Sequence, residues 1–139
     1  MNLVLDNSIV MRWYFGDGKP GDLAYAGRVL EALETGRALV PATWCLEAAN
    51  VIARAEARGL VTEARSTAFL GLLQDLDIEV DPDTVQHALS STLQLARRYG
   101  LSAYDASYLE LALRKAVPLA TLDEGLQGAA KRAGAARFR

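Results

Sequence analysis

Four carboxylates stand at the borders between the expected strands and helices of this 139-residue chain. Asp6 ends an apolar run near the first residue, and Asp123 follows the apolar run VPLAT. Glu47 and Asp105 each fall in the first turn of an expected helix. Carboxylate oxygens suit hard divalent cations such as Mg²⁺ or Mn²⁺, and acids that hold such ions support phosphoryl transfer or phosphodiester hydrolysis. The four acids are therefore candidate metal ligands and catalytic groups.

Other kinds of reactive site find little support in the composition. Zinc prefers His and Cys ligands, and the chain has one of each, His87 and Cys45, far apart in sequence. At ~100° per residue, His87 lies about 200° around its helix from Val85 and is expected to face solvent. A Ser–His–Asp or Cys–His nucleophile is therefore not expected. The Gly-rich stretch GDGKPG lacks the spacing of a phosphate-binding loop and is expected to be a turn.

Each acid except Asp6 also has a purely structural interpretation. Ser102 and Asp105 have the spacing of a capping box, and Thr121 and Glu124 have the same spacing. An acid such as Glu47 in a first helical turn is favoured by the helix dipole. Asp6 differs, because a carboxylate at the end of a buried strand is costly without a partner.

The elements that must position these acids alternate along the chain. Expected strands are Leu3–Asp6, Arg37–Pro41, Asp77–Asp81 and Val117–Thr121, with a short edge strand at Ala136–Arg139. Expected helices span 23–36, 44–58, 63–76, 81–100 (starting from the Asp81–Pro82 pair), 101–116 and 122–133, and 16–22 is expected to be a loop.

Alternation of this kind predicts an α/β fold with a mostly parallel sheet covered on both faces. Helices that follow parallel strands begin at the carboxyl edge of the sheet, so Asp6, Glu47 and Asp123 are expected on one rim. Asp105 joins them if its helix also starts there.

The totals favour one globular domain, residues 1–139. Hydrophobic residues make up 51% of the chain and charged residues 23%, and no apolar run approaches the roughly 20 residues that span a bilayer. The absence of a basic leader and the single cysteine lead us to expect a cytoplasmic protein. A net charge of −2 gives no sign of a nucleic-acid binder and does not exclude one. The arginines are thinly spread, and most of them, Arg114 included, are expected on solvated helix faces.

The chain resembles the PIN-domain ribonucleases, in particular the VapC-type toxins of bacterial and archaeal toxin–antitoxin pairs. Four blocks in matching order carry the resemblance over nearly the whole chain: LVLDNSIVMRWYF, VPATWCLEAANVIARA, LSAYDASYLELA and PLATLDEGLQGAA. It implies a three-layer α/β/α domain with a five-stranded parallel sheet in the order 3-2-1-4-5. The acidic quartet is then Asp6, Glu47, Asp105 and Asp123, with hydroxyls from Ser8 and Thr121 nearby and Asn50 able to orient Glu47.

The resemblance also implies an activity and partners. The expected reaction is Mg²⁺-dependent hydrolysis of RNA phosphodiester bonds, with Mn²⁺ as the alternative ion, leaving a 5′-phosphate and a 3′-hydroxyl. Arg12, close to Asp6, is the one arginine expected to contact an RNA phosphate. A small antitoxin that masks the acidic groove and a homodimer are the implied partners.

Other α/β proteins with acids at the sheet edge fit less well. A receiver domain needs paired acids after its first strand and a lysine after its fifth, whereas Asn7 follows Asp6 here and no suitable lysine closes the sheet. A haloacid-dehalogenase-like phosphatase needs Asp-x-Asp, and Ser8 occupies the place of the second acid. A pure binding module would lack the acids. A non-catalytic, receiver-like module is kept as the alternative.

Overall fold

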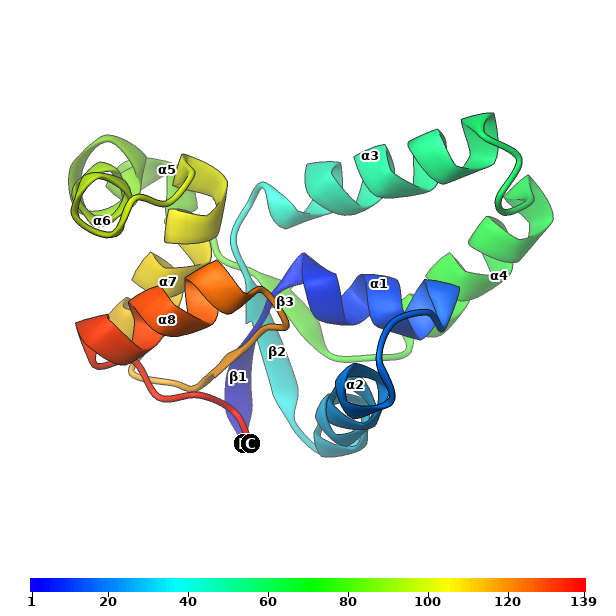
Figure 1. Ribbon diagram of the computed structural model, residues 1–139, viewed down its shortest axis with the longest axis horizontal. Helices are drawn as coiled ribbons and strands as arrows, with labels where there is room; N and C mark the ends of the chain where they lie inside the picture. The colour runs from blue at the N-terminus through cyan, green and yellow to red at the C-terminus, as the bar shows by residue number, and fades with distance from the viewer.

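The computed structural model describes residues 1–139 as alternating strands and helices (Figure 1). In chain order the elements are β1 (Asn2–Leu5), α1 (Asn7–Phe15), α2 (Pro20–Ala32), β2 (Arg37–Val40), α3 (Trp44–Ala57), α4 (Glu63–Gln74), β3 (Ile78–Val80), α5 (Thr84–His87), a π-helical turn η1 (Ala88–Thr92), α6 (Leu93–Tyr99), α7 (Ala103–Lys115), β4 (Leu119–Ala120) and α8 (Glu124–Ala133). The expected α/β alternation is confirmed.

The strands form one parallel sheet in the order β3-β2-β1-β4. The expected fifth strand is absent, and its place is taken by one isolated parallel bridge between Leu119 and Arg137. β4 has only two residues, so it offers a neighbour a single pair of backbone groups. The amide of Leu119 donates to the carbonyl of Ala136 (2.8 Å), and the amide of Phe138 donates to Leu119 (3.0 Å). The order of the other four strands agrees with the expected one.

Helices cover the sheet on both sides (Figure 1). Helices α1 to α4 lie on one side of the strands, and α5 to α8 lie on the other. Leu3, Val4 and Leu5 of β1 are each at most 1% exposed, as a strand covered on both faces requires. Seven consecutive residues of α7, Ala106–Ala112, are also buried, because this helix packs against the sheet and against α6 and α8.

The α3–α4 pair extends from the sheet and is fastened to α1 by a second small apolar cluster (Figure 1). Tyr14 of α1 stacks on Phe69 of α4, with ring centroids 4.5 Å apart. Its hydroxyl lies 2.7 Å from Oγ of Ser66. These contacts fix the direction of α3, which carries Glu47.

Several expected element borders differ from the structure. The loop at 16–22 is shorter, because Pro20 is the first residue of α2. The helix expected over 81–100 starts at Thr84 instead, and the π-helical turn interrupts it. Asp81 does not cap it, because its carboxylate is engaged by Thr84 and Arg114.

Helix α1 was not expected from the sequence. The remaining helices lie close to their expected ranges, and α2 ends four residues before Gly36. That glycine passes so close to the N-terminal segment that an added Cβ would lie 2.4 Å from the carbonyl oxygen of Met1. No helix has the length and apolar character needed to cross a lipid bilayer.

Candidate active site

Asp6 is held at the junction between β1 and α1, where the first strand pairs with β4. Its amide donates to the carbonyl of Ala120 (3.0 Å), so Asp6 and Thr121 follow paired strands at the same edge. Asp6 is buried, with only 5% of the residue exposed. Its Oδ2 accepts hydrogen bonds from Ser8 Oγ (2.6 Å) and Thr121 Oγ1 (2.7 Å). Both hydroxyls therefore orient this carboxylate, and neither carries a charge.

The same two hydroxyls connect the start of the chain to the loop after β4. Ser8 Oγ accepts a hydrogen bond from the Leu122 amide (3.0 Å), and Thr121 Oγ1 accepts one from the Asp123 amide (3.0 Å). Each hydroxyl thus donates to Asp6 while it accepts from the backbone. The loop that carries Asp123 is fixed beside Asp6 as a result.

Glu47 reaches the region from the first turn of α3. The residue is half-buried, and its Oε1 accepts a hydrogen bond from the hydroxyl of Tyr108 on α7 (3.0 Å). Tyr108 is fully buried, and its helical position gave no sign of a polar role in the sequence. Asn50 lies on the same helix, is exposed and makes no hydrogen bond with Glu47. Its proposed orienting role stays a prediction.

Asp105 occupies the first turn of α7 without completing a capping box. Ser102 caps the helix, and its Oγ accepts from the Asp105 amide (3.1 Å). The reciprocal half is missing, because the half-buried Asp105 carboxylate makes no hydrogen bond or ion pair with the rest of the chain. Helix capping therefore leaves this carboxylate free for another role.

Asp123 has a structural role of its own as the N-cap of α8. Its Oδ1 accepts a hydrogen bond from the Leu126 amide (2.8 Å). The alternative of a capping box between Thr121 and Glu124 is not formed, since the cap lies two residues later than Thr121. The carboxylate is exposed, and its negative charge acts on both Asp6 and Asp105.

Asp6, Glu47, Asp105 and Asp123 lie close enough together that neighbouring carboxylate charges raise the pKa values of the first three. Burial, together with the nearby charges of Asp6 and Asp105, raises the pKa of Glu47 to about 7. Burial, with the charges of Asp123 and Asp6, raises the pKa of Asp105 to about 6. Burial raises the pKa of Asp6 as well, although its hydroxyl donors oppose the shift. No basic side chain offsets these shifts, so the site carries uncompensated negative charge.

The donor chemistry of the site fits a hard divalent cation. Carboxylates and hydroxyls supply only oxygen ligands, and one buried oxygen beside Asp6, Asn7 Oδ1, lacks any hydrogen-bond partner. No three Asp, Glu, His or Cys side chains are gathered closely enough around one point to hold an ion together. The set therefore matches Mg²⁺ in the kind and charge of its ligands, and its side chains are not drawn around a common centre.

Arg12 lies on α1 after Asp6 and is already paired. Its Nη1 forms an ion pair with Asp17 Oδ1 at 2.5 Å, and its guanidinium packs beside Gly18. The arginine is therefore anchored to the loop that follows α1.

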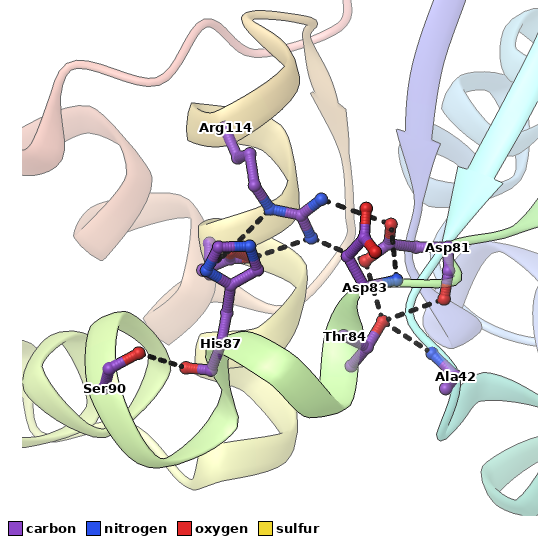
Figure 2. Close-up of polar contacts among 8 residues, drawn as sticks. Ala42, Asp81, Asp83, Thr84, His87, Ser90 and Arg114 are labelled. Atoms are coloured by element: carbon purple, nitrogen blue, oxygen red, sulfur yellow. Dashed lines mark hydrogen bonds and ion pairs between the residues drawn. The ribbon is translucent and has the colours of Figure 1, made fainter.

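A second cluster of carboxylates lies at the end of β3 and contains its own cation (Figure 2). Figure 2 shows the guanidinium of Arg114 directed toward Asp81, with Thr84 on the other side of that carboxylate. Arg114 Nε also donates to Glu110 Oε1 (2.7 Å), four residues earlier on α7. His87 Nδ1 lies 3.7 Å from the same Glu110 oxygen.

Two expectations about this second cluster are wrong. Arg114 is not on a solvated helix face, because it is engaged by two buried carboxylates. His87 does not face solvent, since its side chain is turned toward α7 and is 29% exposed. Val85, the residue against which this orientation was judged, is 79% exposed, so the side of the helix about 200° away from it faces α7.

Comparison with known proteins places the fold. Similar solved structures include the protein PAE2754 from Pyrobaculum aerophilum, 23% identical with a TM-score of 0.64 over 93% of this chain and 79% of that chain. They also include VapBC2 from Rickettsia felis bound to a DNA fragment from its promoter, 12% identical with a TM-score of 0.65 over 100% of this chain and 98% of that chain. No curated protein matches the sequence. Residues 3–132 match the family described as PIN domain, and the chain belongs to that family.

Proposed function

We propose that this protein is a metal-dependent endoribonuclease that acts as the toxin of a toxin–antitoxin pair. The observation that carries the proposal is that burial and neighbouring carboxylates raise the pKa values of Asp6, Glu47 and Asp105, which lie together at the carboxyl edge of the sheet without a basic partner. PIN domains are in general nucleases, which agrees with acids placed to receive a cation. A receiver-like module, the alternative from the sequence, has no observation in its favour.

The side chains would divide the work according to their environments. Asp6, Asp105 and Asp123 would hold Mg²⁺ or Mn²⁺, with Ser8 and Thr121 keeping the Asp6 carboxylate oriented. A bound ion would supply Lewis-acid activation of water and neutralise charge on the scissile phosphate. Glu47, with its pKa raised to about 7, is suited to accept a proton from the attacking water near neutral pH.

The proposed partners follow from the family and from the exposed surface. RNA is the substrate, and Arg12 contacts one of its phosphates through the N–H groups that Asp17 leaves free. A small antitoxin inhibits the enzyme, as the structural likeness to VapBC2 suggests, and the toxin is a homodimer in the cytoplasm.

Cleavage of RNA by the purified protein tests the proposal. With Mg²⁺ we expect cleavage to products with 5′-phosphate ends, and excess EDTA should abolish it. Asp6→Asn and Asp105→Asn should each lower the rate about a hundred-fold or more, because each removes a ligand charge. Asp75→Asn is the matched control, since Asp75 is an exposed aspartate at the end of α4, away from the site.

Two results would contradict this function. One is cleavage that persists at full rate in EDTA, and the other is full activity of Asp105→Asn. The toxin role has a separate test, which is growth arrest on expression of the wild-type protein and its relief in the Asp105→Asn variant. Growth arrest that is equal in both would reject nuclease activity as its cause.

A further inference from the structure

A large cleft with several charged side chains lies beside the sheet edge, outside the acidic site. It encloses about 810 Å³ between α2, α8 and the segment that follows α8. Five charged residues line it, and four of them are basic: Arg28, Lys131, Arg137 and Arg139, against Glu124. The cleft is thus a local concentration of positive charge in a chain whose net charge is −2.

The basic groups in this cleft are not neutralised by carboxylates. None of Arg28, Lys131 and Arg137 has a carboxylate oxygen within 4.0 Å, whereas Arg12, Arg37 and Arg114 all form ion pairs. All three side chains are exposed. Their N–H groups are therefore available to an anionic ligand.

Two of these arginines are held in place by an aromatic ring instead of an acid. The guanidinium carbon of Arg137 lies 4.8 Å from the ring centroid of Tyr25, and that of Arg28 lies 5.4 Å from it. Stacking on an aromatic face restrains a guanidinium while it leaves the N–H edge and the full charge available. The arrangement is suited to binding phosphate.

The backbone beneath Arg137 is also fixed. The hydroxyl of Tyr25, on α2, donates to the carbonyl of Phe138 (2.6 Å). The Leu119 amide donates to the carbonyl of Ala136 (2.8 Å), which ties the same segment to β4. A rigid segment loses little conformational entropy when it binds a ligand. Ordering of this segment therefore does not weaken ligand binding in the cleft.

The cleft meets the acidic site at Thr121. This residue lines the cleft, and its hydroxyl donates to Asp6 Oδ2 (2.7 Å). Gln127, another lining residue, donates to the carbonyl of Thr121 (2.8 Å). A polyanion held in the cleft would therefore pass directly to the acids.

We propose that this cleft binds the phosphate backbone of single-stranded RNA and guides the strand to the acidic site. The inference rests on the proposed nuclease function and adds the path of the substrate. Arg28, Lys131 and Arg137 contact phosphates, and because they read no base edge they give affinity without sequence preference.

Binding of a fluorescent single-stranded RNA, measured by polarisation in EDTA to prevent cleavage, tests the path. We expect Lys131→Gln and Arg137→Gln each to raise the dissociation constant about five-fold at 0.1 M salt. Each should also reduce the slope of log affinity against log salt by about 0.7, since one phosphate contact is lost. Arg137→Lys keeps the charge and should retain most of the slope.

Arg97→Gln provides the matched control, because Arg97 is an exposed arginine on α6, outside the cleft and outside any ion pair. Melting temperatures show whether each variant keeps its fold. Lys131 is exposed and its side chain forms no hydrogen bond or ion pair, so its variant separates loss of binding from loss of structure.

The outcomes distinguish this inference from the nuclease proposal. Salt-dependent binding that is lost in the cleft variants supports the path, even if the wild-type protein proves unable to cleave RNA. Metal-dependent cleavage with unchanged affinity in the cleft variants overturns the path alone. Absence of RNA binding in the wild-type protein overturns it too, as does binding of polyglutamate but not RNA, which would assign the cleft to an acidic protein segment.

Discussion

Two buried aspartates at the carboxyl edge of the sheet have opposite electrostatic fates. Asp6 follows β1 and is 5% exposed, and Asp81 follows β3 and is 4% exposed. Asp6 receives only two hydroxyl donors, and burial raises its pKa. Burial would raise the pKa of Asp81 as well, but hydrogen bonds from Arg114 and Thr84 outweigh burial and hold it below its ordinary value.

The difference shows how one strand-end position serves either stability or ligand binding. A guanidinium neutralises a buried carboxylate, so the cluster around Asp81 holds β3, α5 and α7 together without a ligand (Figure 2). Hydroxyls orient a carboxylate and leave its charge in place, so the cluster around Asp6 stays costly until a cation arrives. The absence of a counter-ion, more than the presence of acids, distinguishes the candidate active site from the cluster around Asp81.

Removing Arg114, the cation of the cluster around Asp81, should give the largest effect on stability. In Arg114→Met, the buried carboxylates of Asp81 and Glu110 lose their partner, and the free energy of unfolding should fall by about 3 kcal/mol. Urea denaturation at pH 7 measures it. Arg37→Met is the control, because Arg37 pairs with two half-exposed acids and its loss should cost much less than the loss of Arg114. Equal losses in both variants would show that the Asp81 cluster is not a buried pair.

Removing one negative charge from the acidic site around Asp6 should instead raise the stability of the protein. The pKa of Asp105 is raised from 3.8 to about 6, so the folded state binds its proton more tightly than the unfolded state does. Wild-type stability therefore falls as pH rises through this window, and Asp105→Asn escapes the loss. At pH 8 in EDTA the variant should be more stable by about 1 kcal/mol, after allowance for solvent screening of this half-exposed group.

The pH dependence makes this second prediction specific. The advantage of Asp105→Asn, measured by urea denaturation, should shrink toward zero at pH 4 and disappear at pH 8 when Mg²⁺ is added to the wild-type protein. Asp75→Asn serves as the exposed control and should show no such dependence. A variant that is less stable than wild type at pH 8 would mean that Asp105 is compensated within the chain.

The smallest expected effect concerns one hydrogen bond in the acidic site, from the Tyr108 hydroxyl to Glu47. Tyr108→Phe removes the donor to Glu47 Oε1, which now partly opposes the upward shift of the Glu47 pKa. That pKa should rise above about 7 by roughly half a unit, equivalent to about 0.7 kcal/mol. NMR titration of the Glu47 side chain measures the shift. Tyr104→Phe on the exposed face of the same helix should leave it unchanged, and an equal shift in both variants would contradict the proposed role of the bond.

Local patterns in the sequence predicted most of the elements, and the resemblance to the PIN-domain ribonucleases implied the strand order from β3 to β4. The apolar run before Asp6 marks β1 because a strand covered on both faces excludes polar residues. The fifth strand was predicted and did not form, since the two residues of β4 offer only one bridge to the segment around Arg137. The helix expected over 81–100 starts late, at Thr84, because the carboxylate of Asp81 is engaged by Thr84 and Arg114.

The counter-ions could not be predicted from the sequence, because they come from distant elements. Asp81 and Arg114 are 33 residues apart, and Glu47 and Tyr108 are 61 apart, so spacing alone gives no sign of either pair. The Glu110–Arg114 spacing is the one local signal, and it is equally typical of a solvated helix face. The one sequence signal of the basic cleft is the composition of residues 125–139, which include four basic residues and no acid.

The two hydroxyl groups that donate to Asp6 come from opposite ends of the chain, which determines when the acidic site can form during synthesis. Thr121 stands 115 residues after Asp6 in the chain, and Asp123 follows it. A fragment that stops before β4 lacks one of the two hydroxyls and one of the four acids. The acidic site is therefore completed only after β4 and the loop that carries Thr121 and Asp123 have been synthesised.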